Sequence, residues 1–275
     1  MTSLWAHIDL LGRFVTQNVE YTFRVFLMAY LSLRATILDK SQGFRQIVEV
    51  ISAQIYFTGW QALPLVSVLA LGVGGVLIMQ SLANLSFLGG TEMIGSFLTV
   101  MIIREAGPLL VALVVIARSG TAVASEVGNM RANREMEALE SMGINPLSFI
   151  VFPRVVGGVI SVLGLAFYFN FIALVGGYLV TRFVQDMPMA FYVDSLMRAF
   201  SGQDVFIFLL KNIFSGVIIF VVCCYQGFCV KRSPHEVPQV TTQAVVNSII
   251  FVVVFNLIVS ALFYLNQLRN LGVIS

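Results

Sequence analysis

Charge is scarce in this sequence. Only 11% of the 275 residues are Asp, Glu, Lys or Arg, whereas soluble domains carry about 25%. Hydrophobic residues make up 58% of the chain, and the mean hydropathy is +0.91. This composition excludes an ordinary soluble globular protein, and the formal net charge of +2 gives no basis for binding nucleic acid. The chain is therefore expected to place most of its surface in lipid.

The patterns typical of metal, disulfide and nucleotide sites are also missing. Cys223, Cys224 and Cys229 lie in one apolar run without the paired spacing of zinc sites, so we interpret them as packing residues. His7 and His235 are far apart, and neither an HExxH motif nor a G-x-x-x-x-G-K-[ST] loop occurs. We therefore expect a chain that is not an enzyme, with no catalytic residue, metal or cofactor. If the protein works with ATP, another chain must bind it.

The first 50 residues mix apolar and charged residues instead of forming one long apolar run. This segment lacks the layout of a cleaved signal peptide, in which a charged stretch precedes an apolar one, because charged residues are scattered through it at Asp9, Arg13 and Glu20. The apolar core from Phe23 to Leu33 is too short for a bilayer, whose hydrocarbon of about 30 Å needs on the order of 20 residues. We interpret residues 1–50 as an amphipathic segment in the cytoplasmic interface. The alternative is an ordinary first transmembrane helix with misjudged ends.

Residues 51–275 are expected to form one transmembrane domain. Five apolar runs are long enough to span a bilayer and predict, with the N-terminal interfacial helix, an all-α integral membrane protein. Pro64 predicts a kink in the first run, and Lys211 is interpreted as a snorkelling side chain near one end of the fourth. Residues 187–200 predict a short amphipathic helix at the opposite interface. The five runs are 53–87, 93–117, 155–181, 205–230 and 240–268.

The second run contains two adjacent ionisable residues, Arg104 and Glu105. A charge at the centre of a span costs about 2.5–3.5 kcal/mol on translocon scales, so both side chains must face protein or water. Pro108 frees the carbonyl of Arg104 from its helical hydrogen bond and loosens the backbone there. We interpret the two charges as a candidate functional site. The alternative is a structural ion pair between helices, with no contact to substrate.

Basic residues are distributed unevenly over the expected loops. With the N-terminus inside, eleven lie on the cytoplasmic side and four outside, which predicts a cytoplasmic N-terminus and a periplasmic C-terminus. The eleven are Arg13, Arg24, Arg34, Lys40, Arg45, Arg118, Arg131, Arg134, Arg154, Lys231 and Arg232, and the four are Arg182, Arg198, Lys211 and Arg269.

The longest polar stretch, Arg118 to Pro146, falls on the cytoplasmic side between the second and third runs. It predicts a helix over about 121–143, whose apolar stripe consists of Val127, Met130, Leu139 and Met142. Gly143 followed by Pro146 is typical of a helix stop. The helix is either a docking surface for a soluble partner or a solvated loop helix. Just before it, Gly120, Ala124 and Gly128 form a small-residue stripe suited to close helix packing.

Several motifs in one order resemble the signature of the MlaE family. The resemblance covers roughly residues 50–268, with departures at Ala106, Ala117 and Met136, where the family commonly has Leu, Gly and Gln. The motifs are Arg104 to Pro108, Ala117 to Gly120, Glu126 with Gly128 and Met130, Glu135, Ala138 with Leu139, Met142 with Gly143, and Pro146.

MlaE-family proteins are the permease subunits of ABC transporters that act with MCE proteins on lipids. The resemblance implies an inner-membrane homodimer with cytoplasmic ATPase subunits, which bind ATP and Mg, and periplasmic MCE-domain proteins. A small STAS-domain subunit is a further implied partner. The implied function is movement of phospholipid between the inner membrane and the periplasm to maintain outer-membrane lipid asymmetry. The polar helix would be a coupling helix, with Glu126, Gly128, Met130, Glu135, Leu139, Met142 and Gly143 on the ATPase side.

The same resemblance places a lipid path in the first and second spans. Leu77 and Met79, beside Gln80 and Asn84, would take acyl chains, and Arg104, Glu105 and Pro108 would line or gate the head-group path. Arg104 and Glu105 would either lie near this path or hold the gate by forming an ion pair with each other. Two other classes remain open from the residues themselves. One is an ion-coupled secondary transporter with its proton site at Arg104 and Glu105, and the other is a membrane scaffold subunit.

Overall fold

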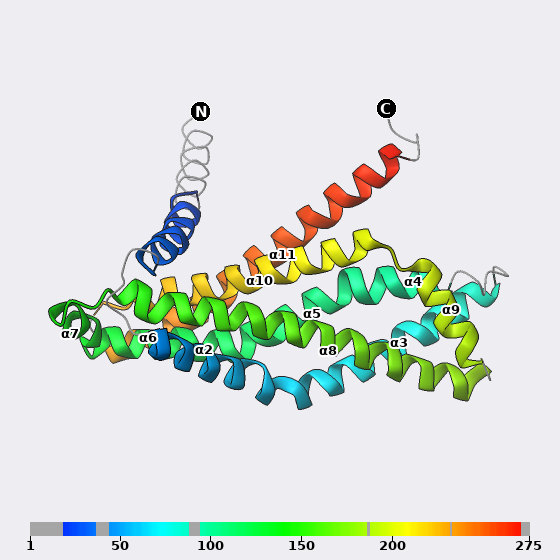
Figure 1. Cartoon of the computed structure of the whole chain (residues 1–275), viewed down its shortest axis with the longest axis horizontal. Helices are drawn as coiled ribbons and strands as arrows, with labels where there is room; N and C mark the ends of the chain where they lie inside the picture. Colours follow the sequence, from blue (N-terminus) through cyan, green and yellow to red (C-terminus); the bar gives the residue numbers. More distant parts are fainter. Residues whose placement is uncertain (1–18, 37–43, 88–93, 186–187, 232, 271–275) are drawn as a thin grey trace, which may run out of the picture.

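The protein is an elongated bundle of long helices (Figure 1). Within the ranges that the computed structural model describes, every regular element is helical, and five stretches are long and apolar enough to cross a membrane. The predicted all-α class and the number of five spans are confirmed. The described ranges are 19–36, 44–87, 94–185, 188–231 and 233–270. The candidate spans are Ile47–Ser81, Thr99–Ala132, Leu147–Val180, Gly202–Phe228 and Pro234–Arg269.

A separate helix, residues 19–36, stands at a steep angle to the long helices and points away from them (Figure 1). Tyr21 anchors it, because the Tyr21 hydroxyl accepts hydrogen bonds from the amide of Gln226 at 2.9 Å and the amide of Asn247 at 3.1 Å. Burial raises the pKa of Tyr21 to about 12, so the hydroxyl stays neutral in this contact. The helix is thereby fixed to the fourth and fifth spans.

The first span is interrupted near its middle. It consists of α2 (Phe44–Thr58), the 3₁₀ turn η1 (Trp60–Ala62) and α3 (Leu63–Phe87). The interruption ends just before Pro64, so the predicted kink is confirmed. Because α2 begins at Phe44, the expected division at residue 50 falls inside a helix.

The second span is longer than expected and is continuous from residue 94 to residue 132. Two segments of the rare, wider π-helix lie within it, and this geometry is frequent at functional sites. One carries Arg104 and Glu105, and the other carries Arg118. In order, the span contains α4 (Ile94–Leu98), η3 (Thr99–Ala106), α5 (Gly107–Val115), η4 (Ile116–Gly120) and α6 (Thr121–Ala132).

The prediction of a single helix over about 121–143 is wrong, because the chain forms two helices there. The first is α6, which continues the second span, and the second is α7 (Glu135–Ser141), at the end of the bundle opposite α4 and α9 (Figure 1). Between them Arg134 adopts a left-handed conformation with φ 61°. Gly143 has φ 75°, so the predicted glycine stop is confirmed.

Close packing explains why α6 stays in the bundle. A Cβ added at Gly120 would lie 3.0 Å from the sulfur of Cys223, and one added at Gly227 would lie 2.7 Å from Val127. Gly120, the first residue of the predicted small-residue stripe, and Gly227 therefore allow η4 and α6 to pack closely against α10 (Gly202–Phe228). The apolar stripe expected to continue to Met142 does not form, because Met142 lies beyond the bend and is 66% exposed.

The remaining helices complete the bundle. The third span begins with the π-helical segment η5 and continues as α8, and α9 confirms the short helix predicted near residues 187–200, although Met187 itself lies outside the described residues. Gly158 of α8 meets the ring of Phe220 of α10 so closely that a Cβ would overlap it. The elements are η5 (Leu147–Val151), α8 (Phe152–Gln185), α9 (Met189–Ala199), α10, η6 (Pro234–Glu236) and α11 (Val237–Asn270).

Candidate functional site

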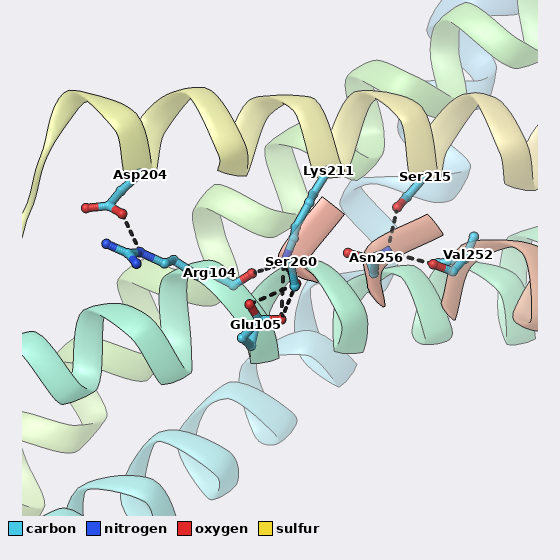
Figure 2. Close-up of polar contacts among 8 residues, drawn as sticks. All are labelled: Arg104, Glu105, Asp204, Lys211, Ser215, Val252, Asn256 and Ser260. Atoms are coloured by element: carbon cyan, nitrogen blue, oxygen red, sulfur yellow. Dashed lines mark hydrogen bonds and ion pairs between the residues drawn. The ribbon is translucent and has the colours of Figure 1, made fainter. Parts of the chain in front are cut away.

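Four charged residues meet inside the bundle, where η3 passes α10 and α11 (Figure 2). Arg104 of η3 forms an ion pair with Asp204, which lies in the first turn of α10 and is 0% exposed. The other carboxylate oxygen of Asp204 accepts hydrogen bonds from the main-chain N–H of Ser201 at 2.9 Å and its hydroxyl at 3.0 Å. One carboxylate thus neutralises Arg104 and caps the start of α10.

Lys211 lies two turns further along α10 and donates to three acceptors. It forms an ion pair with Glu105 at 3.1 Å, and it donates to the Ser260 hydroxyl of α11 and to the Arg104 carbonyl, both at 2.7 Å. Ser260 also lies 2.9 Å from Glu105 and donates to it. Lys211 is 1% exposed, and its three N–H donors are satisfied by these partners. The network joins three spans.

Pro108 explains why the carbonyl of Arg104 accepts from Lys211. In a regular α-helix this carbonyl would accept from the N–H four residues later, and proline has none. The wider geometry of η3 places this part of the backbone beside α10. The hydrogen bond that proline removes within the helix is thus replaced by one between helices.

An apolar cavity of about 550 Å³ lies between α10 and α11, beside this network. Its wall includes Phe206, Leu210, Leu262 and Phe263. The Arg104 guanidinium lies 4.9 Å from the centroid of the Phe263 ring, within cation–π range. Charged groups therefore adjoin an apolar wall, an arrangement that suits an amphiphilic molecule.

The structure corrects two expectations about these charges. Arg104 and Glu105 do not pair with each other, because neighbouring residues on a helix point in different directions, and each has its own partner on α10. Lys211 does not snorkel to a helix end. It stays buried because the carboxylate of Glu105 and the carbonyl of Arg104 compensate for its lost hydration.

Asp204, Lys211 and Ser260 were not identified from the sequence. The available signal was the spacing of Asp204 and Lys211, which are seven residues apart and so share one face of a helix otherwise rich in apolar residues. Because Lys211 is buried in the bundle, it no longer counts among the basic residues outside the membrane. The excess of Lys and Arg on the cytoplasmic side is therefore larger than the sequence count indicated. Ser260 gave no signal, because single serines are common in transmembrane helices.

The candidates on α3 that the structure describes are not part of this hydrogen-bonded network. Leu77 is half-buried, Met79 and Gln80 are exposed, and the side chain of Asn84 lies outside what the structure describes. In the described part of the chain, no hydrogen bond or ion pair joins Leu77, Met79 or Gln80 to Arg104 or Glu105. Pro108 is buried next to the network.

The candidates for ATPase coupling divide into two groups. Near the end of the bundle, Glu135, Met142 and Gly143 are exposed, and Leu139 is half-buried, as is Met130 on α6. Within the bundle, Gly128 packs against Val230 and Val237, and Glu126 forms an ion pair with Arg154 of α8 at 2.8 Å. Apart from Glu126, whose side chain is 60% exposed, the exposed candidates are therefore concentrated around α7. Met136, at the family's usual glutamine position, is buried.

A second polar contact joins the first two spans. Arg118 of η4 donates to the carbonyl of Phe57 at 2.7 Å and to the side-chain oxygen of Gln61 at 2.8 Å. The guanidinium also lies 4.9 Å from the centroid of the Phe57 ring. Carbonyls at the end of a helix lack helical donors, so Arg118 caps α2 where the first span is interrupted.

The fold and the paired internal charges define an all-α, multi-pass membrane protein. The Permease MlaE family model matches residues 51–262, so the chain belongs to the MlaE permease family.

Two of the three relatives described next are named as transport permeases. A probable ABC transporter permease of Rickettsia conorii is 32% identical over 79% of this chain and 84% of its own length. The intermembrane phospholipid transport system permease protein MlaE of Haemophilus influenzae is 26% identical over 94% and 97%. The chloroplastic protein trigalactosyldiacylglycerol 1 of Arabidopsis thaliana is 26% identical over 77% of this chain and 60% of its own length.

Proposed function

We propose that this chain is the permease subunit of an ABC-type transporter that moves phospholipid between the inner membrane and the periplasm. The observation that carries the proposal is the charge network of Arg104, Glu105, Asp204 and Lys211, in which Asp204 and Lys211 are buried, beside an apolar cavity in a member of the MlaE family. The name of the Haemophilus relative supports phospholipid as the substrate. Maintenance of outer-membrane lipid asymmetry, together with MCE proteins, is the proposed role.

The proposed assembly is a homodimer with separate cytoplasmic ATPase subunits that bind ATP and Mg. A periplasmic MCE-domain protein and a small STAS-domain subunit are the further proposed partners. The unequal distribution of Lys and Arg supports a cytoplasmic N-terminus and a periplasmic C-terminus. Residues 19–36 would lie in the cytoplasmic interface, since this helix exposes Phe23, Phe26 and Tyr30.

The proposed ATPase contact is α7. Glu135, Glu137, Glu140 and Met142 are exposed there, and the helix lies at the extreme end of the bundle (Figure 1). Such a charged, protruding helix suits a groove on a soluble partner.

The continuity of α6 with the second span suggests how motion reaches the charge network. A displacement of α7 would be carried by helix from residue 132 to residue 104, about 40 Å at 1.5 Å per residue. At Arg104 the two ion pairs hold the second span against α10. ATP-driven movement would shift the relative stability of two arrangements of these helices and so admit or release lipid from the apolar cavity.

Purification of the complex and its reconstitution into vesicles test this function. The expected result is copurification of an ATPase and phospholipid movement that requires ATP. An ion-coupled secondary transporter would instead move its substrate without the ATPase. A scaffold subunit would show neither ATP dependence nor bound lipid, and either result would contradict the proposal.

A further inference from the structure

A second cavity, of about 360 Å³, lies between α2, α6 and α8, on the α7 side of the bundle. Its volume falls within the range of ligand pockets, roughly 300–1,000 Å³. Val50, Ala53 and Phe57 of α2 form an apolar wall with Ala122 and Val123 of α6.

The polar end of this cavity carries one positive and one negative group. Arg154 is 8% exposed and donates to the carbonyl of Ile150 at 3.0 Å and to Glu126 at 2.8 Å. A guanidinium has five N–H donors, so these two bonds leave others for a ligand. The Glu126 side chain is 60% exposed, and its carboxylate has further acceptor positions. The cavity therefore offers a buried cation and an accessible anion side by side.

The depth of the cavity matches the level of lipid head groups. The three spans around it have 34 or 35 residues, about 50 Å of helix, against a hydrocarbon core of about 30 Å. Glu126 lies six residues before the end of its span at Ala132, and Arg154 lies seven after the start of its span at Leu147. Both are therefore about 10 Å from the helix ends, where head groups meet acyl chains.

We infer that this cavity binds a phospholipid with a zwitterionic phosphoethanolamine head group from the leaflet on the α7 side. The phosphate would accept charge-assisted hydrogen bonds from Arg154, and the primary ammonium would donate to Glu126. The first part of an acyl chain would lie along Phe57 and the other apolar residues of the wall. A purely anionic head group fits less well, because Glu126 repels it. The site is separate from the charge network and does not depend on the proposed transport activity.

Photolabelling of the full chain in vesicles tests the site. The vesicles contain equal amounts of phosphatidylethanolamine and phosphatidylglycerol, with a trace of either lipid carrying a diazirine near the glycerol. Peptide mass spectrometry then locates the adducts. The wild-type chain should be labelled on residues 50–57 and 122–126 about tenfold more by the ethanolamine probe than by the glycerol probe.

Two variants and one control variant make the outcome specific. Glu126→Gln should reverse the preference, since Arg154 then faces the lipid without a competing carboxylate. Ala53→Phe fills the cavity and should abolish labelling of both segments, whereas Ser52→Phe, on an exposed neighbour outside the cavity, should leave it unchanged. Equal labelling of the wild-type chain by both probes would overturn the inference. So would labelling of Ala53→Phe at the level of Ser52→Phe.

Discussion

Lys211 donates a hydrogen bond of 2.7 Å to the main-chain carbonyl of Arg104, across the interface between α10 and the second span. The carbonyl is the one that Pro108 leaves without its usual helical donor. A buried ammonium and an unpaired carbonyl are each costly alone, and here each satisfies the other. The two helices are consequently held together at the residues that the family signature also marks.

The pair of Arg104 and Asp204 should contribute strongly to stability. Asp204→Asn retains an oxygen that can cap α10 but removes the charge, and breaking a buried ion pair costs about 3–5 kcal/mol. We expect a decrease of this order in the free energy of unfolding, measured by denaturant titration in detergent. Ser201→Ala is the control, because it removes the cap hydroxyl alone and should cost about 1 kcal/mol. Equal losses in both variants would contradict an energetic role for the ion pair.

Arg118 should stabilise the interruption in the first span. Arg118→Lys cannot reach the carbonyl of Phe57 and the side chain of Gln61 together, since an ammonium lacks the fork of a guanidinium. We expect faster hydrogen exchange of the amides around residues 57–63, reflecting a loss of roughly 1–3 kcal/mol. Arg182→Lys, on the exposed end of α8, is the control and should leave exchange there unchanged. Unchanged exchange in Arg118→Lys would show that the contact does not stabilise the interruption.

The surface of α7 should bind the ATPase. Glu135→Arg combined with Met142→Asp changes two exposed residues without disturbing the half-buried Leu139. We expect the ATPase to be lost from the permease in a pull-down. Asp194→Arg combined with Met197→Asp makes matched changes on α9 at the other end of the bundle, where both side chains are exposed, and should retain it. Normal stoichiometry in the α7 variant would exclude this surface.

Tyr21 should hold the helix of residues 19–36 on the bundle. Tyr21→Phe leaves the amides of Gln226 and Asn247 without their acceptor, at a cost of about 1–3 kcal/mol. We expect limited proteolysis to cut near this helix faster than in the wild-type chain. Tyr30→Phe, at a position that is 60% exposed, is the control. Equal cleavage rates in the two variants would contradict an anchoring role.

The same contact should depend on pH in one direction. The pKa of Tyr21 is raised from about 10 in an unfolded chain to about 12 in the folded protein. Because the neutral hydroxyl is the favoured form, its contribution is complete below about pH 10 and is lost as the pH rises towards 12. Proteolysis of the wild-type chain should therefore be constant from neutral pH to about pH 9.

Much of the architecture was predictable because the thickness of the bilayer sets the minimum length of an apolar run that can span it. The interruption before Pro64 and the stop at Gly143 were predictable as well, since proline and glycine restrict or permit specific backbone conformations. The division between α6 and α7 was not predictable. The polar composition of residues 121–132 suggested a surface helix, but the packing of Gly120 and Val127 against α10 retains this segment in the bundle.

Only the residues that the second span contributes to the candidate site were predictable from the sequence. Arg104 and Glu105 stand out as adjacent charges in an apolar span, but their partners both belong to α10, about 100 residues later in the chain. Asp204 and Lys211 lie within the first turns of an apolar run. Charged side chains near the end of such a run are equally expected if they reach the water at the membrane surface. Only the arrangement of η3 against α10 distinguishes a buried ion pair from a snorkelling lysine.

The most direct test compares phospholipid movement and ATP hydrolysis in reconstituted complexes that carry Lys211→Met or Glu105→Ala. Both variants remove the pair between the second span and α10. We expect assembled complexes that still hydrolyse ATP but move phospholipid at least about tenfold more slowly, equivalent to the loss of one charge-assisted hydrogen bond. Wild-type phospholipid movement by both variants would contradict it.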